Sequence, residues 1–239
     1  GRWFISVNVE QDIEVPVNNG SIEGVDLGIK NLAVVSDGTV IENPKALHRN
    51  ERKLKRLQRS VSRKKKGSNN RRKAVQKLNR AHFRVSNIHK DSLNKATTML
   101  ARTKSVIVVE DLAVAEMLGG GLAKSLSDAS LSEFRRQLEY KAGWYGSKVV
   151  VADRFYPSTK RCSNCGNVKE AMALSERVYE CQSCGFKADR DFNASLNLKS
   201  VAVGFPDTLN ACPRPEVQTA RSVLVDEAGI QTCQVLTSF

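Results

Sequence analysis

Alternation of apolar and polar positions predicts several short strands in the first part of the chain. Apolar and polar side chains alternate over residues 3–9, which is typical of a half-buried strand. Further strands are expected over residues 22–27, 32–36 and 39–42. An Asp-Gly pair separates the last two and favours a tight hairpin turn between them. The pattern therefore indicates the beginning of a β-sheet.

The middle of the chain changes to helical spacing and to strong positive charge. Apolar positions recur every three or four residues in two runs, with a polar turn at residues 64–70 between them. Residues 49–104 hold 20 of the 38 Lys and Arg residues and only two acids. We predict a basic helical hairpin over residues 45–103. Because a solvated helix face normally mixes both signs of charge, this one favours nucleic-acid contact. The residues expected to contact phosphates are Arg52, Lys53, Arg56, Arg63, Lys64, Lys65, Lys66, Arg71, Arg72, Lys73, Lys77 and Arg80.

Strand and helix patterns alternate after the hairpin. A β-branched run at residues 105–114, which ends in acids, predicts a buried strand, and the Gly- and Ser-rich residues 119–130 predict a loop. A helix is expected over residues 131–145 and a strand over residues 148–152. This order is typical of parallel strands joined by helices, so the predicted fold class is α/β.

The end of the chain combines one helix with a tail of low periodicity. A helix is expected over about residues 192–200. Residues 204–239 contain three prolines and no regular pattern, so we expect this tail to be poorly ordered.

The overall composition points to an anionic partner. The net charge is +13 and the isoelectric point is about 9.6, which favours nucleic acid or an acidic membrane surface. No apolar run approaches the ~20 residues of a membrane span, and the first residues do not resemble a signal peptide. We expect a soluble, cytoplasmic nucleic-acid-binding protein with no membrane contact.

The spacing of the cysteines predicts a zinc ribbon. The pattern is C-x2-C-x15-C-x2-C, which is typical of four thiolates around one structural zinc ion. Gly166 and Gly185 directly follow the second cysteine of each pair, where a zinc knuckle often needs a positive φ. Cys212 and Cys233 stand apart and are expected to be plain thiols. The predicted ligands are Cys162, Cys165, Cys181 and Cys184.

Three acids occupy positions that are unusual for surface carboxylates. Asp26 lies in an apolar strand, Glu110 ends another, and Asp191 precedes a helix. Taken singly, Asp26 and Glu110 could be exposed strand ends, and Asp191 could be a helix N-cap. Carboxylates from separate elements of one α/β domain are also what two Mg²⁺ ions need for phosphodiester hydrolysis.

Four motifs in order carry a resemblance to a known family. They are GVDLGIKNLAVVSDG, VIVVEDL, CSNCG followed by CQSCG, and DRDFNASLNL. Over about residues 1–200 the sequence resembles the RuvC-like nuclease half of the transposon-encoded TnpB (OrfB) family, relatives of the type V CRISPR effectors. The resemblance implies an RNase H-like fold with catalytic acids at Asp26, Glu110 and Asp191, and Asp189 as the alternative third acid. Ser195 stands where the family usually has Ala.

The resemblance also implies an activity and a domain layout. The implied activity is RNA-guided, Mg²⁺-dependent cleavage of DNA, directed by a guide RNA from the transposon end. The alternative is a catalytically silent or truncated nucleic-acid-binding protein, such as a guide-dependent repressor or a transposon remnant. A DNA-joining transposase, a common label in the family, is a third possibility.

The family pattern places boundaries along the chain. Family members carry a further N-terminal half, and residues 1–15 are expected to be the terminal strand of that part. Residues 16–157 would form the nuclease core with its basic hairpin, residues 158–187 the zinc ribbon, and residues 188–203 the last motif and its helix.

Overall fold

The computed structural model contains two units that are described separately. Contacts group residues 16–211 into one unit, and residues 1–15 with 212–239 into the other. In the second unit, strands β8 (Val223–Val225) and β9 (Gln231–Cys233) form an antiparallel pair. The expectation for the rest of the tail beyond Gly204 lies outside the described residues. The structure describes residues 5–9, 14–173, 175–204, 223–225 and 231–233.

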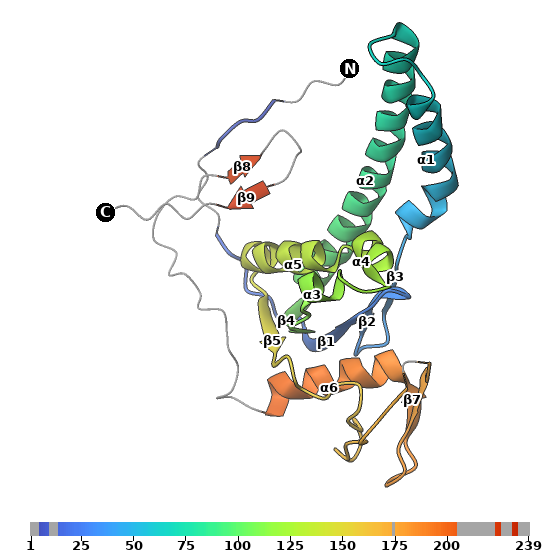
Figure 1. Ribbon diagram of the computed structural model, residues 1–239. Coiled ribbons are helices and arrows are strands. Elements are labelled where there is room, and N and C mark those ends of the chain that lie inside the picture. Colours follow the sequence, from blue (N-terminus) through green and yellow to red (C-terminus); the bar gives the residue numbers. More distant parts are fainter. Residues whose placement is uncertain (1–4, 10–13, 174, 205–222, 226–230, 234–239) are drawn as a thin grey trace. The chain divides into compact units, whose positions relative to one another are not determined.

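A five-stranded sheet forms the centre of the larger unit, in the order β3-β2-β1-β4-β5 (Figure 1). β1, β2 and β3 pair antiparallel, whereas β1, β4 and β5 are parallel. All five strands were expected from the hydrophobic pattern. Their bounds are Ser21–Leu27 for β1, Asn31–Val35 for β2, Val40–Glu42 for β3, Lys104–Glu110 for β4 and Lys148–Ala152 for β5.

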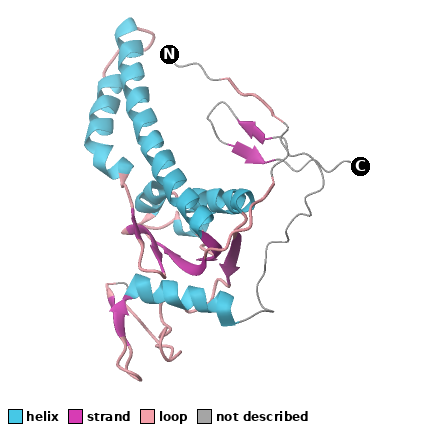
Figure 2. Cartoon of the chain, turned by 180° about the vertical axis from the view of Figure 1, so that it is seen from behind, coloured by secondary structure: helices cyan, strands magenta, loops and turns pink. Residues whose placement is uncertain are grey.

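Helices cover both faces of this sheet (Figures 1 and 2). On one face, α2 (Asn69–Thr103) and α5 (Leu131–Tyr145) enclose the main apolar core with Val25, Ile107 and Val109 of the strands. On the other face lies α6 (Arg190–Gly204), whose buried Leu198 packs against Val108 and Val150. The chain thus has a three-layered, mixed α/β arrangement.

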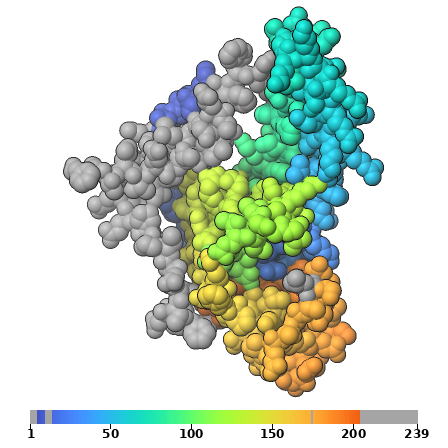
Figure 3. Space-filling model, in the orientation of Figure 1, coloured from blue at the N-terminus to red at the C-terminus, as the bar shows by residue number. Residues whose placement is uncertain are grey.

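The basic segment forms the expected helical hairpin. α1 (Ala46–Ser62) lies against the outer half of α2 and shares with it a separate apolar cluster that includes Leu54, Val61 and Leu78. The inner half of α2 belongs to the main core through Leu93 and Leu100. Figure 3 shows the outer part of the hairpin, in cyan, projecting beyond α5. One continuous helix therefore joins two hydrophobic cores.

The structure corrects two expectations from the sequence. Residues 119–130 were expected to be a loop, but α4 (Ala123–Ala129) begins soon after the glycines because Leu126 and Ala129 are buried on one helix face. A short helix, α3 (Val114–Met117), precedes it. Residues 5–9 form no strand, and Ile5, Val7 and Val9 are exposed rather than packed in a sheet. Residues 3 and 4 of that expected strand lie outside the described residues.

A small cysteine-containing module connects β5 to α6. Strands β6 (Val178–Glu180) and β7 (Lys187–Asp189) pair antiparallel within it, and β7 runs directly into α6. None of the helices in the described residues has the length and apolarity that a membrane span requires.

Candidate active site and metal centre

Asp26 and Glu110 lie at the carboxyl ends of neighbouring parallel strands. Val25 pairs with Val109 in the ladder between β1 and β4, so the next residue of each strand is one of the two acids. Side chains alternate between the faces of a strand, and both valines point into the core under α2 and α5. Asp26 and Glu110 therefore both point to the face that α6 covers.

Asp191 reaches the same region from the first turn of α6. Asp189 Oδ1 accepts hydrogen bonds from the backbone N–H groups of Asp191 and Phe192, at 3.0 and 3.2 Å, and so caps the helix. The side chain of Asp191 is then not needed as the cap. Its Oδ1 lies 3.5 Å from Arg190 Nε. The structure thus gives the two neighbouring acids different local roles.

The charges of the neighbouring acids act on Asp26. Burial raises the pKa of Asp26 well above its ordinary range, and the carboxylates of Glu110 and Asp191 raise it further, while Arg190 opposes them. Among the described residues, however, only the four cysteines have ligand atoms that all lie within 4.8 Å of one another. The acids are close enough to interact electrostatically, but their oxygens are more widely spaced than the sulfurs.

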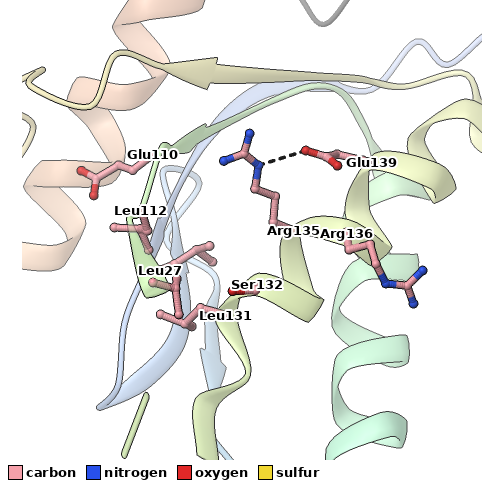
Figure 4. A pocket seen from close by; sticks show the side chains of 9 residues that line it. Leu27, Glu110, Leu112, Leu131, Ser132, Arg135, Arg136 and Glu139 are labelled. Atoms are coloured by element: carbon pink, nitrogen blue, oxygen red, sulfur yellow. Dashed lines mark hydrogen bonds and ion pairs between the residues drawn. The ribbon is translucent and has the colours of Figure 1, made fainter. Parts of the chain in front are cut away.

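Ser158 holds Glu110 in place. Its hydroxyl donates a short hydrogen bond to Glu110 Oε1, and its carbonyl accepts one from Asn197 Nδ2 of α6 at 2.7 Å. Burial raises the pKa of Glu110, and the bond from Ser158 acts against that rise. Figure 4 shows the Glu110 carboxylate directed toward α6, at the edge of a cavity of about 210 Å³. Glu110 lines this cavity together with Leu112 and Arg135.

Two asparagines attach the cysteine module to α6. Asn193 and Asn197 both donate from Nδ2 to the carbonyl of Arg161 at 2.7 Å, and Asn193 Oδ1 accepts from the Ser163 N–H at 3.1 Å. Both asparagines are buried. The helix that begins with Asp191 is therefore bonded directly to the loop that carries the first cysteine pair.

Gly24 permits the close approach of α6 to β1. A Cβ atom at this position would lie 2.1 Å from the carbonyl oxygen of Ser195 and 2.4 Å from the amide nitrogen of Lys199. Both are helix backbone atoms. The absence of a side chain at Gly24 thus sets the distance between Asp26 on the strand and the start of α6.

The four cysteines form a site that could hold one zinc ion. The Sγ atoms of Cys162 and Cys184 are 3.7 Å apart, and those of Cys165 and Cys181 are 3.6 Å apart. Zinc–sulfur bonds of about 2.3 Å in a tetrahedron separate the sulfurs by about 3.8 Å. The donor set and its dimensions both fit zinc.

The two cysteine turns share one backbone geometry. Gly166 and Gly185 have φ values of 78° and 72°, as their positions after the cysteines predicted. The N–H of each glycine donates to the carbonyl of the first cysteine of its pair, at 2.9 and 3.0 Å. A backbone N–H bond from Cys184 lowers the pKa of Cys181, and one from Phe186 lowers the pKa of Cys184, which favours their thiolates. Against a backbone N–H bond from Asn167, the neighbouring sulfurs raise the pKa of Cys165.

The basic hairpin presents an unneutralised surface. Ten of the twelve side chains expected to contact phosphates are exposed, and Lys64 and Arg71 are half-buried. Arg71 Nη1 donates to the carbonyl of Val61 at 3.1 Å, so it also stabilises the end of α1. In the described part of the chain, no carboxylate forms an ion pair with any of the twelve.

Sequence reasoning missed the residues that connect these elements. Ser158, Asn193 and Asn197 form their bonds with residues up to 48 positions away, and no local pattern marks them. Asp111 was also missed, although it follows Glu110 directly and pairs with Arg135 of α5 at 2.7 Å. Asp111, Asn193 and Asn197 lie inside the recognised motifs, which was their only signal, whereas Ser158 lies outside them.

Comparison with known proteins places the chain in a family. The family model OrfB_IS605, described as "Probable transposase", matches residues 4–119, and the model "Cas12f1-like, TNB domain" matches residues 132–198. A "Putative RNA-guided DNA endonuclease" from Streptomyces pristinaespiralis is 40% identical over 93% of this chain. The chain belongs to the TnpB (OrfB) family.

A further relative matches a similar part of the chain, and a solved structure shares its fold. The "Putative RNA-guided DNA endonuclease InsQ" of Escherichia coli (strain K12) is 38% identical over 83% of this chain. The chain covers 55% and 53% of these two relatives, and so spans about half of their length. The "Cryo-EM structure of the Cas12f1-sgRNA-target DNA complex" matches with a TM-score of 0.55 and 18% identity, over 78% of this chain and 51% of that chain. At this identity the match shows a shared mixed α/β fold.

Proposed function

We propose that this chain is the RuvC-like nuclease half of an RNA-guided DNA endonuclease. Its sheet and helices would then be an RNase H-like domain, with the basic hairpin and the zinc ribbon as insertions. One observation carries the proposal: Asp26, Glu110 and the first turn of α6 with Asp191 meet on one face at the ends of two parallel strands. The named relatives support a nuclease that acts on DNA with an RNA guide.

Asp26, Glu110 and Asp191 would hold the catalytic cations. Carboxylate oxygens suit Mg²⁺, and like charges brought together out of water favour a bound cation. Two Mg²⁺ ions, when bound, supply an activated water and stabilise the leaving 3′ oxygen.

The surrounding residues would fix the geometry of the acids. Asp26 and Glu110 are carried by hydrogen-bonded strands, and Ser158 restrains the Glu110 carboxylate. Asp189 caps α6 and leaves the carboxylate of Asp191 available. Such restraint keeps the acids in position without reorganisation during the reaction. The hairpin would bind the phosphate backbone of the guide RNA or of the target DNA.

Cleavage by the protein expressed from its own locus, together with its transposon-end RNA, tests the proposal. Asp26→Ala, Glu110→Ala and Asp191→Ala should each reduce cleavage of target DNA to background, because the remaining pair of acids cannot hold two ions. Mg²⁺ or Mn²⁺ should support cleavage, and Ca²⁺ should support binding alone. Glu180→Gln is a matched control, since Glu180 is an exposed ribbon acid paired only with Lys187 at 3.3 Å.

Two results would contradict this function. Cleavage that survives any of the three single substitutions would exclude the two-metal site. Binding of RNA and DNA without cleavage, in the parent protein and with any of the divalent ions, would instead favour the catalytically silent binding protein.

A further inference from the structure

Phe155 is an aromatic side chain that the fold leaves in solvent. It is 88% exposed, whereas the next residue, Tyr156, packs against the apolar cluster beneath α6. Single exposed apolar side chains are common on protein surfaces, so the meaning of Phe155 depends on what lies around it.

The backbone around Phe155 is fixed on both sides. The Phe155 N–H donates to Asp153 Oδ1 at 2.8 Å, and the Tyr156 N–H donates to the Asp153 carbonyl at 3.0 Å. The Tyr156 hydroxyl donates to the carbonyl of Asn197 on α6 at 3.1 Å. The turn therefore fixes the backbone from which the Phe155 ring projects.

The exposed ring lies next to the candidate active site. β5 ends at Ala152, which pairs with Glu110, and Ser158 returns to donate a hydrogen bond to that same glutamate. Phe155 is three residues from Ser158, a span of at most about 11 Å. Phe155 therefore lies on the short segment between the two contacts with Glu110.

We propose that Phe155 stacks on an unpaired nucleobase of the strand that enters the site formed by Asp26, Glu110 and Asp191. This inference rests on the proposed function, because it places the base beside the phosphate to be cut. Bases in a duplex already stack on one another, so an exposed protein ring selects a single strand. The adjacent Arg154 is already paired with Asp111 at 3.3 Å and with Glu116 at 3.5 Å, so the proposed stacking relies on the ring and not on charge.

Binding measured without cleavage tests the stacking by itself. In the Asp26→Ala background and without divalent ions, the probe is an oligothymidylate of about 12 nucleotides, which is within the usual single-strand site sizes. Phe155→Ala should weaken binding about 5- to 150-fold, as expected for loss of one base–aromatic stack. Phe155→Trp should bind at least as tightly as the parent. Phe155→Leu, which keeps the apolar volume without the ring, should behave like Phe155→Ala.

Two further probes separate stacking from other effects. A base-free deoxyribose-phosphate chain of the same length should bind the parent and Phe155→Ala equally, because it offers nothing to stack. A duplex of that length should also bind both equally. If Phe155→Ala weakens binding of all three probes alike, the ring contacts another part of the protein or the backbone, and the proposal is wrong.

The outcomes distinguish this proposal from the proposed function. If the active-site variants lose cleavage but Phe155→Ala binds the oligothymidylate as tightly as the parent, the proposed nuclease function stands and the stacking is refuted. A ring-dependent preference for the oligothymidylate in a protein that never cleaves would support the stacking and refute the nuclease.

Discussion

Gly24 controls, at the scale of one residue, how closely a helix can approach the sheet. The strand backbone lies against the backbone of α6, and both atoms that a Cβ would meet there are main-chain atoms. Main-chain atoms inside a helix cannot rotate away as a flexible side chain can. A larger residue must therefore displace the whole helix together with Asp191.

Gly24→Ala should destabilise the protein by about 3 kcal/mol, the upper part of the range for overpacking a core. Urea unfolding followed by circular dichroism would measure the change. Gly143→Ala on α5 is the matched control, because a Cβ added there would meet no atom within 4 Å. That substitution should stabilise by about 0.5–1 kcal/mol through helix propensity. Equal stability of the parent and Gly24→Ala would show that α6 does not pack as described.

Lys141 is a buried cation between α2 and α5. Its Nζ donates to the Asn94 carbonyl at 3.1 Å, to Thr97 Oγ1 at 2.7 Å and to Gln137 Oε1 at 3.3 Å. The residue is only 4% exposed. Burial lowers its pKa from 10.5 to about 8, against the attraction of Glu133.

Stability should consequently rise with pH in the alkaline range. Between about pH 8 and 10.5 the unfolded chain keeps the Lys141 proton and the folded protein loses it, so raising the pH favours the folded state. The gain should be about 2–3 kcal/mol across this window. Lys141→Met should remove this part of the pH dependence. The difference between parent and variant in plots of unfolding free energy against pH separates Lys141 from other titrating groups. If the two plots run parallel, the pKa of Lys141 is not lowered.

At the scale of elements, α4 fastens the basic hairpin to the core. Asp128 of α4 accepts the N–H groups of Leu47 and His48, at 2.8 and 3.0 Å, at the beginning of α1. It also lies 2.6 Å from His89 Nε2 of α2. One buried carboxylate thus bonds to both helices of the hairpin, in place of a side-chain cap from α1 itself.

Asp128→Ala should destabilise the protein by about 1–3 kcal/mol, because buried N–H groups lose a charged acceptor. Amide hydrogen exchange should accelerate first at Leu47 and His48. Asp91→Ala is a suitable control, because Asp91 pairs with Lys95 on an exposed helix face. Its replacement should change the free energy of unfolding by less than about 0.5 kcal/mol. Unchanged exchange at the start of α1 would mean that another group caps it.

Local patterns account for much of this architecture, and their limits are equally clear. The five strands of the central sheet, the two long helices and the positive φ of Gly166 and Gly185 follow from periodicity and turn chemistry. α4 was missed because three glycines precede it and two serines lie within it, although tertiary packing of Leu126 favours the helix. The bonds of Ser158 and Asn197 join distant segments, and such contacts leave no periodic signal in a sequence.

At the scale of the whole molecule, the positive charge is concentrated on the hairpin. Replacing Lys65, Lys66, Arg72, Lys73 and Lys77 with Gln should weaken nucleic-acid binding, because each of these exposed side chains can contact a phosphate. The slope of log affinity against log salt should fall by about 0.7–0.9 per lost contact. Arg71 is left unchanged because it bonds to Val61.

A variant with three paired lysines neutralised provides the comparison. Lys55, Lys95 and Lys124 form ion pairs with Glu51 or Asp91, and their replacement by Gln should change the salt slope much less. An unchanged slope in the five-residue variant would show that nucleic acid binds elsewhere.

Loss of zinc from the ribbon should weaken the contact of the ribbon with α6, the helix that carries Asp191. Cys181→Ser should lower the zinc content measured by elemental analysis, because the site needs all four sulfurs. Hydrogen exchange should then accelerate at Ser163, whose N–H bonds to Asn193. Cys233→Ser should keep its zinc. Retention of a full equivalent of zinc by Cys181→Ser would contradict the four-sulfur site.

The length and continuity of α2 have a mechanical consequence. At 1.5 Å per residue its 35 residues form a rod about 50 Å long. The rod ends at Thr103, and β4, the strand that carries Glu110, begins at Lys104 without an intervening loop. A single peptide bond therefore links the long helix to the strand that carries Glu110. A nucleic acid that tilts the tip of the hairpin would act on that strand through this bond.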